Sequence, residues 1–286
     1  MSGKGSDSLA EAERLAAAIG PLRLGRQHAR LSIQAGQHAQ RRAGSGTEFW
    51  QYRPLAAGEA HARVDWRRSA RSDDFYVRER EREEPGRLLL WVDGSGSMRF
   101  RSGEQVPEKF QRAHEILVAL AIAAKEAEEH VRVAGSPDVR TVPAIAQALI
   151  GLDQRFDPAR VRPGDMLVIA SDFLDGGSLD FVERLSGQGI GGVLLTVVDP
   201  AEDDFPFKGH VRFERSEPHD PETDVGRAEM IADRYSAAWG AHRERLKAAG
   251  GRAGWTQVMH RTDIAAAAAL ETIAGFLRDG REPWAA

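Results

Sequence analysis

The sequence predicts an α/β fold with a doubly wound, mostly parallel central sheet flanked by helices, and a helical and β-rich extension at its N-terminus. Short apolar runs such as LLLWVD, residues 88–93, are too short for buried helices and are typical of strands covered on both faces. These runs alternate with segments of helical periodicity, which indicates a parallel sheet. The apolar fraction of 42% and the charged fraction of 29% are near globular averages, so a sizeable core is expected.

Three parts follow one another along the 286 residues. Residues 1–20 are interpreted as a flexible N-terminus with a short helix, because a Gly-Pro pair stops the helical pattern there. Residues 21–84 form a distinct segment predicted to pack on the core. Its arginine-rich beginning, residues 21–42, is either a solvated helix face or a docking face for an acidic partner, and the remainder is typical of short strands. Residues 85–286 are predicted to be the α/β domain with its C-terminal helices.

Strands and helices alternate within the third part. The longest helix is predicted over residues 107–130, where apolar residues recur on one face and Pro107 suits the first turn. The other predicted elements are strands at residues 88–93, 131–134, 166–172, 192–199, 211–213 and 255–259, and helices over residues 142–149, 179–185, 223–249 and 263–277. Ligands of such a fold bind outside the carboxyl ends of the strands.

A set of hard oxygen ligands follows the first of these strands. Asp93, Ser95 and Ser97 in DGSGSM present one carboxylate and two hydroxyls at alternate positions of a turn. Mg²⁺ or Mn²⁺ prefers such ligands, and two neutral hydroxyls would leave the ion electrophilic enough to accept a partner's carboxylate. Asp172, at the end of the strand over residues 166–172, is predicted to lie beside this loop and to hold a metal-bound water.

A complete site of this kind also takes a threonine from an intervening loop. Thr141 is the only threonine between Ser97 and Asp172, and it directly precedes a predicted helix. Its hydroxyl is therefore either a further metal ligand or a simple helix cap.

The segment YRPLAAGEAHARVDWRRSARSDDFYVRERE, residues 52–81, resembles the bacterial family called domain of unknown function 58. The family pattern of Tyr-x-Pro, Gly-Asp/Glu, Arg-x-x-Asp-Trp, Ser-Ala-Arg and Val-Arg-Glu falls on Tyr52, Pro54, Gly58, Glu59, Asp65, Trp66, Ser69, Ala70, Arg71, Val77, Arg78 and Glu79. The DGSGSM loop, SDFLD and the stretch VVDPAEDDFPFKG follow in the family's order, so the resemblance covers nearly the whole chain. Residues 130–140 are short for such a domain, which predicts a pared-down strand pair.

The resemblance implies a von Willebrand factor A-like, Rossmann-like domain with a metal-ion-dependent adhesion-type site. It also implies an adaptor working beside a MoxR-type AAA+ ATPase in the maturation or assembly of a client protein. Charges nearly balance over residues 52–82, so this segment is interpreted either as salt-bridged packing against the main domain or as a partner-docking surface. The candidate partner-binding residues are Arg53, Asp65, Trp66, Arg71 and Arg78, with Trp66 predicted to be a core anchor.

Catalysis is not expected from this sequence. The chain has no cysteine, which excludes disulfides and thiolate metal sites, and it has no GxxxxGK string for ATP phosphates. Arg99 stands where a dinucleotide-binding loop has its third glycine, and Ser95 lacks the flanking glycines of a hydrolase nucleophile. The alternative that stays open is a Rossmann-like nucleotide- or metal-dependent enzyme.

Charge and hydropathy bear on partners and location. The formal net charge of −4, and the absence of aromatic residues among the arginines of residues 21–42, argue against nucleic acid as a partner. The N-terminus lacks the apolar region of a signal peptide, and no apolar run is long enough to span a bilayer. These features predict a cytoplasmic protein without a membrane span.

Overall fold

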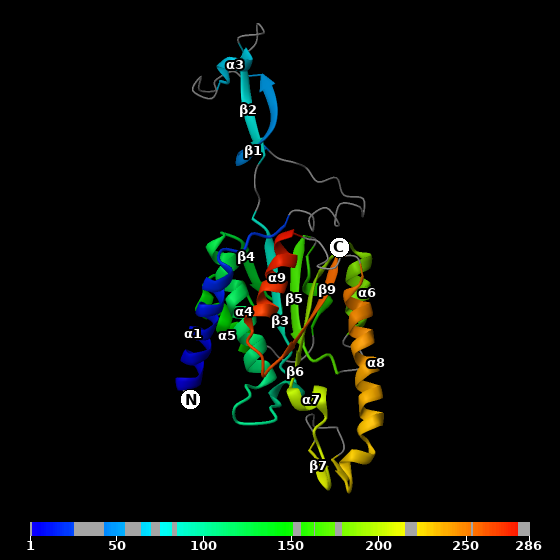
Figure 1. The fold of residues 1–286 in the computed structure, drawn as a ribbon. Helices are drawn as coiled ribbons and strands as arrows, with labels where there is room; N and C mark the ends of the chain where they lie inside the picture. The colour runs from blue at the N-terminus through cyan, green and yellow to red at the C-terminus, as the bar shows by residue number, and fades with distance from the viewer. Residues whose placement is uncertain are drawn as a thin grey trace. The chain divides into compact units, whose positions relative to one another are not determined.

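The computed structural model divides the chain into two compact units, which are described separately. Unit 1 comprises Met1–Ala35 and Gly86–Ala286, and unit 2 comprises Gly36–Pro85. The structure describes residues 2–25, 43–54, 64–69, 75–81, 85–150, 156–162, 164–174, 179–214, 222–252 and 254–279. Figure 1 traces the chain through the elements of both units.

Unit 1 is built on a five-stranded sheet. Its strands are β3 (Arg87–Val92), β4 (His130–Val133), β5 (Asp165–Ser171), β6 (Gly192–Val198) and β9 (Trp255–Arg261). They lie in the order β4-β3-β5-β6-β9, and every neighbouring pair is parallel. The predicted α/β class with a doubly wound sheet is therefore confirmed.

The strand order creates a switch point between β3 and β5. The chain leaves β3 to form β4 on one side and then returns to form β5 on the other. Loops that depart in opposite directions leave a crevice at the carboxyl ends of the two strands, where α/β proteins bind their ligands. The residues that follow β3 and β5 are therefore the first to consider for function.

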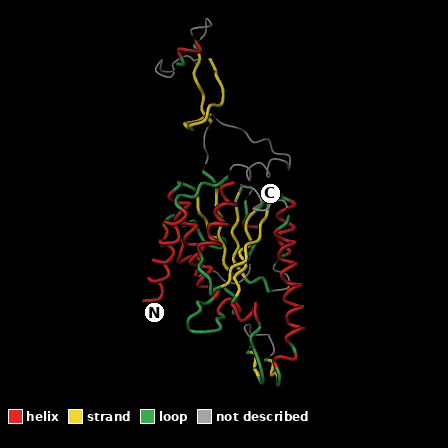
Figure 2. Tube along the Cα trace, in the orientation of Figure 1, coloured by secondary structure: helices red, strands yellow, loops and turns green. Residues whose placement is uncertain are grey.

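Helices cover both faces of the sheet, as Figure 2 shows. Leu88, Leu90 and Val92 of β3 face one core, which is closed by α1 (Ser2–Ile19), α4 (Lys109–Glu126), α5 (Val142–Ile150) and α9 (Ala267–Asp279). Leu89 and Trp91 face the second core, under α6 (Asp180–Gly187) and α8 (Ala232–Gly250). Successive side chains of a strand point to opposite faces, which is why both sets in LLLWV are apolar.

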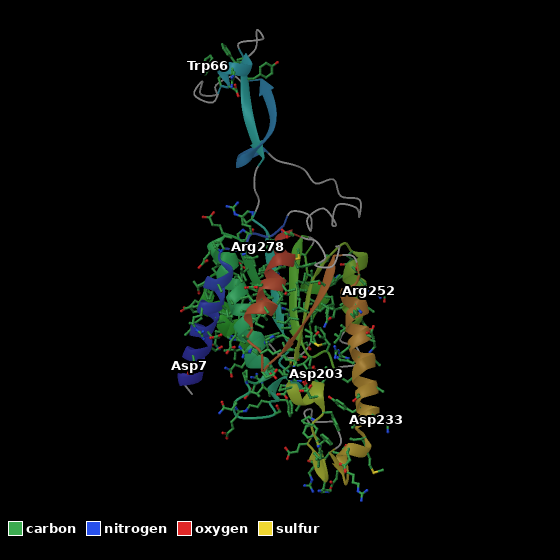
Figure 3. All side chains as sticks on the ribbon, viewed as in Figure 1. Asp7, Trp66, Asp203, Asp233, Arg252 and Arg278 are labelled. Carbon is green, nitrogen blue, oxygen red and sulfur yellow. The ribbon has the colours of Figure 1, made fainter. Side chains whose placement is uncertain are left out.

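Helix α1 is longer than the sequence predicts. It begins at Ser2, whereas apolar residues take up helical spacing only from Leu9. Its buried residues join the first core, and the following Leu22 donates its N–H to the carbonyl oxygen of Ala123 at 2.8 Å. Arg278, labelled in Figure 3, donates to the carbonyl oxygen of Ile19 at 2.6 Å. Helix α1 and residues 20–25 are thus integral to unit 1.

The region after β6 departs from the prediction at one place. Residues 223–249 were expected to form one helix, but β8 (Thr223–Val225) pairs antiparallel with β7 (Val211–Phe213), and α8 begins only at Ala232. Aromatic packing explains the difference, because Phe205 stacks on Tyr235 of α8 with ring centroids 4.5 Å apart. A short helix, α7 (Pro200–Asp204), connects β6 to this hairpin.

Unit 2 contains a two-stranded antiparallel sheet, as its short apolar stretches predict. Strand β1 (Ala43–Pro54) pairs with β2 (Tyr76–Glu81), and one helical turn, α3 (Trp66–Ser69), lies between them in sequence. The Ser69 hydroxyl accepts a hydrogen bond from the Tyr76 N–H at 2.8 Å and so fixes this turn against β2. That this segment packs on the core stays a prediction.

None of the helices in the described part of the chain combines the length and the apolar character needed to cross a bilayer.

Candidate functional site

The candidate site lies at the carboxyl edge of the sheet, at the switch point. Asp93 is the first residue after β3, and its backbone N–H donates to the carbonyl oxygen of Ala170 at 2.8 Å. Its Oδ2 accepts a hydrogen bond of 2.6 Å from the hydroxyl of Ser171, the last residue of β5. The parallel pairing therefore brings the Asp93 carboxylate to the end of the neighbouring strand.

Contacts inside the loop hold Asp93 in place. Its Oδ1 accepts a hydrogen bond from the Ser95 N–H at 2.8 Å, and the fully buried Met98 anchors the turn that follows. Burial raises the pKa of Asp93, hydrogen bonds from Ser171 and Ser95 oppose this effect, and the charge of Asp172 raises the pKa further. The ionised carboxylate is therefore poorly solvated, and a nearby cation would stabilise it.

The two serine hydroxyls of the loop form a pair. Ser95 Oγ and Ser97 Oγ lie 3.2 Å apart. Adjacent ligands of an octahedral Mg²⁺ site, at about 2.1 Å from the ion, are about 3 Å from each other. Among the residues that the structure describes, no group of three or more His, Asp or Glu side chains could hold a metal, so the candidate site depends on these hydroxyls. The hydroxyl pair with Asp93 fits a hard divalent ion.

Asp172 is close by, but its carboxylate is already engaged. The residue follows β5 directly and is 3% exposed. Its Oδ2 accepts from the ammonium of Lys109 at 2.8 Å, and its Oδ1 accepts from the Leu174 N–H at 3.2 Å. His242 Nε2 lies 3.1 Å from its backbone carbonyl oxygen and donates to it. Asp172 is thus fixed from three sides, and its contacts join it to a lysine within the chain.

Sequence reasoning missed Lys109 and Glu202. Lys109 opens α4, and its fully buried ammonium also donates to Glu202 Oε1 at 2.5 Å. Burial lowers the pKa of Lys109, but the charges of Asp172 and Glu202 outweigh it and raise the pKa above its ordinary value. Burial raises the pKa of Glu202, and the ion pair with Lys109 opposes that shift. The lysine is therefore held as a cation between two carboxylates.

The N-terminus of α7 positions Glu202. Asp199 caps this helix by accepting from the Ala201 N–H at 2.8 Å, and Glu202 Oε2 accepts from the Asp199 N–H at 2.9 Å, which completes a capping box. Asp199 Oδ2 also accepts from the Ser102 N–H at 2.8 Å, in the loop between Ser97 and α4. The string Asp-Pro-x-Glu after β6 could have predicted this helix cap from the sequence. Nothing in the sequence could have predicted the contact of Glu202 with Lys109.

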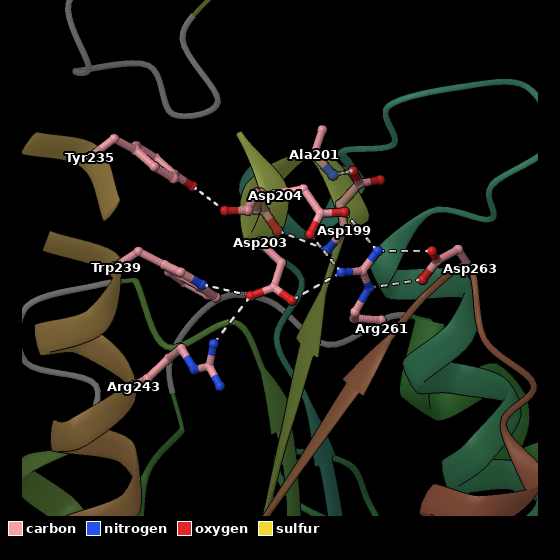
Figure 4. Close-up of polar contacts among 10 residues, drawn as sticks. Asp199, Ala201, Asp203, Asp204, Tyr235, Trp239, Arg243, Arg261 and Asp263 are labelled. Carbon is pink, nitrogen blue, oxygen red and sulfur yellow. Dashed lines mark hydrogen bonds and ion pairs between the residues drawn. The ribbon is translucent and has the colours of Figure 1, made fainter. Parts of the chain in front are cut away.

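An arginine at the end of β9 secures the other side of α7 (Figure 4). Arg261 donates to Asp203 Oδ2 at 3.1 Å and to both carboxylate oxygens of Asp204 at 2.9 Å, and it also pairs with Asp263. Trp239 of α8 donates to Asp203 Oδ1 at 2.9 Å. Burial raises the pKa of Asp203, but the hydrogen bonds from Trp239 and Arg261 outweigh it and leave the pKa below its usual value. Helix α7 is thereby clamped between β9 and α8.

Thr141 makes the contact that a helix cap requires. Its Oγ1 accepts from the Ala144 N–H at 3.4 Å at the start of α5, and the residue is exposed. Within the described residues, no hydrogen bond joins Thr141 to Asp93, Ser95 or Ser97. Its role as a metal ligand stays a prediction.

The candidate partner-binding residues lie in unit 2. Arg71 lies outside the described residues, as do the side chains of Arg53 and Arg78. The Asp65 N–H donates to the carbonyl oxygen of Tyr76 at 2.8 Å, so this residue links the turn to β2. Trp66 was predicted to be a core anchor, and this was wrong: it is 59% exposed (Figure 3).

The reason is local. The Trp66 ring contacts the edge of the Phe75 ring, itself 48% exposed, with ring centroids 5.8 Å apart. The described part of unit 2, a two-stranded sheet with one helical turn, offers no second apolar layer that could enclose an indole.

Comparison with known protein families matches one part of the chain. No curated protein matches it. Residues 51–148 match the family model described as "Protein of unknown function DUF58". The matched region runs from β1 through the Asp93 loop and all of α4 to α5, and so includes Ser95, Ser97 and Lys109. This part of the chain is thus similar to the DUF58 family.

Proposed function

We propose that this chain is a non-enzymatic adaptor that binds a partner protein at the carboxyl edge of its sheet. Asp93, Ser95 and Ser97 would bind Mg²⁺ or Mn²⁺ there. Asp172 lies beside this loop and is not itself proposed to contact the ion. The observation that carries the proposal is the hydroxyl pair 3.2 Å apart beside the partly buried carboxylate of Asp93 at the switch point. A divalent ion bound at these oxygens would supply an electrophilic centre for a carboxylate of the partner.

The surface around the site supports a protein as the partner. Three large apolar side chains are exposed in loops that follow β3, β5 and β9: Phe100 is 39% exposed, Leu174 is 49% exposed and Ile264 is 54% exposed. Exposed apolar residues grouped around a polar centre are typical of protein contact surfaces. The carboxyl edge of the sheet therefore offers exposed apolar side chains as well as a place for one carboxylate.

The partner that we propose is a MoxR-type AAA+ ATPase, acting with the adaptor on a client protein during maturation or assembly in the cytoplasm. The similarity of residues 51–148 to the DUF58 family supports this choice, together with the resemblance described above. The sequence has no phosphate-binding GxxxxGK string, so ATP hydrolysis would be the task of the partner.

The test measures binding between the purified chain and a purified MoxR-type ATPase from the same organism, with Mg²⁺ or with EDTA. We expect binding with Mg²⁺, and Ser95→Ala/Ser97→Ala should weaken it about tenfold or more, as EDTA should. The control is Ser236→Ala on the exposed face of α8, which should bind like the wild type. Equal binding of the wild type and the double variant, with or without EDTA, would contradict the proposal.

A further inference from the structure

A lysine ammonium lies against the carboxylate of Asp172, next to the Asp93 loop. The Lys109 side chain is 0% exposed, and that of Asp172 is 4% exposed. Its Nζ lies 2.8 Å from Asp172 Oδ2 and 2.5 Å from Glu202 Oε1. These three groups come from the start of α4, the end of β5 and the first turn of α7, so three elements converge on one charge.

This arrangement is costly unless the charges are paired. An ammonium removed from water is tolerated only where carboxylates or other acceptors replace its hydration. The two carboxylates do so here, and they carry one negative charge more than the lysine neutralises. Because Asp172 Oδ2 faces the ammonium, the negative charge left near the serine hydroxyls belongs mainly to Asp93.

We propose that Lys109 is a positioning residue that serves as a resident cation for Asp172 and thereby keeps the affinity of the Asp93 loop for divalent metal low. The inference rests on the proposed function, because it concerns the same loop. With Asp172 occupied, a metal ion at Ser95 and Ser97 meets one carboxylate and two neutral hydroxyls. A partner that brings a further carboxylate would complete the shell, so the metal binds weakly without the partner and more tightly with it.

The experiment titrates Mn²⁺ into the full chain by calorimetry. Lys109→Met frees Asp172, and we expect Mn²⁺ to bind roughly tenfold more tightly than to the wild type. Adding Asp172→Asn to this variant should return the affinity to the wild-type level. Lys125→Met, the same substitution in the last turn of α4, is the matched control and should leave the affinity unchanged.

A second variant keeps the inference testable if Lys109→Met alone does not fold. Lys109→Met/Glu202→Gln buries one charge less than the single variant, and it too should bind Mn²⁺ more tightly than the wild type. Circular dichroism and a single cooperative melt establish that each variant is folded. If the folded variants bind Mn²⁺ no more tightly than the wild type, the inference is overturned.

The result also separates the inference from the proposed function. Tight binding by the lysine variants, with none by the wild type even at millimolar Mn²⁺, supports the resident cation and contradicts metal-dependent partner binding. Mn²⁺ binding by the wild type that Ser95→Ala/Ser97→Ala abolishes, with no gain in either lysine variant, keeps the proposed metal site and overturns the role of Lys109.

Discussion

Lys109→Met is expected to lower the free energy of unfolding in EDTA by about 3–5 kcal/mol. The substitution removes the ammonium and leaves two carboxylates, Asp172 and Glu202, facing each other without a counter-charge. For a domain of this size, such a loss lowers the melting temperature by about 10 °C. Urea unfolding monitored by tryptophan fluorescence measures it.

Two further variants show whether the loss comes from the unpaired charges. Lys125→Met, at the other end of α4, should cost less than about 1 kcal/mol, because this side chain lies outside the buried cluster. Lys109→Met/Asp172→Asn/Glu202→Gln should recover part of the stability, since no buried charge is then left unpaired. If Lys109→Met costs no more than Lys125→Met, the ammonium is not desolvated as described.

Lowering the pH is expected to lower the free energy of unfolding of unit 1 because His260 must be protonated. This is the second prediction with a large effect. Burial and the nearby charge of Arg112 lower the pKa of His260 from 6.5 to about 4, and Asp263 only partly opposes them. Between pH 6.5 and about pH 4, the imidazole of His260 is therefore protonated in the unfolded chain and neutral in the folded chain. The stability contribution of His260 is fully present above pH 6.5 and is lost as the pH falls toward 4, by about 3 kcal/mol in all.

Urea unfolding of the wild type and of His260→Gln at pH 7 and pH 5 measures this contribution. The variant should lose about 2 kcal/mol less than the wild type between these two pH values, since it has no group that titrates there. His130→Gln, on the exposed start of β4, is the control. Its free energy of unfolding should change between pH 7 and pH 5 as much as that of the wild type. If all three proteins lose the same free energy of unfolding between pH 7 and pH 5, the buried, neutral state of His260 is contradicted.

The fold was predictable because parallel strands buried on both faces form continuous apolar runs. LLLWV and MLVIA are examples, and both form strands at the predicted positions. The start of α8 was not predictable from periodicity, because β7 and β8 pair with each other and the aromatic contact of Phe205 with Tyr235 joins distant parts of the chain. Propensity describes residues 223–249 as one helix, and tertiary packing overrides it.

The candidate site was predictable only in part. The alternate spacing of Asp93, Ser95 and Ser97 identifies the loop, and the parallel topology brings Asp172 toward it. The role of Lys109 could not be predicted from the sequence, because a lysine in the first turn of a helix is normally solvated. Its burial depends on Glu202, which lies 93 positions further along the chain. Contacts of that separation leave no local pattern in a sequence.

The central claim is that the Asp93 loop binds a divalent ion, and Mn²⁺ calorimetry on the wild type beside Ser95→Ala/Ser97→Ala and Asp93→Ala tests it most directly. The account predicts that the wild type binds one Mn²⁺ per chain weakly and melts at a higher temperature when Mn²⁺ is present, because a ligand of the folded state stabilises it. Neither variant should bind or gain stability. Wild-type protein that shows neither heat of binding nor a thermal shift at millimolar Mn²⁺ would contradict the metal site. Binding that both variants retain would place the ion elsewhere.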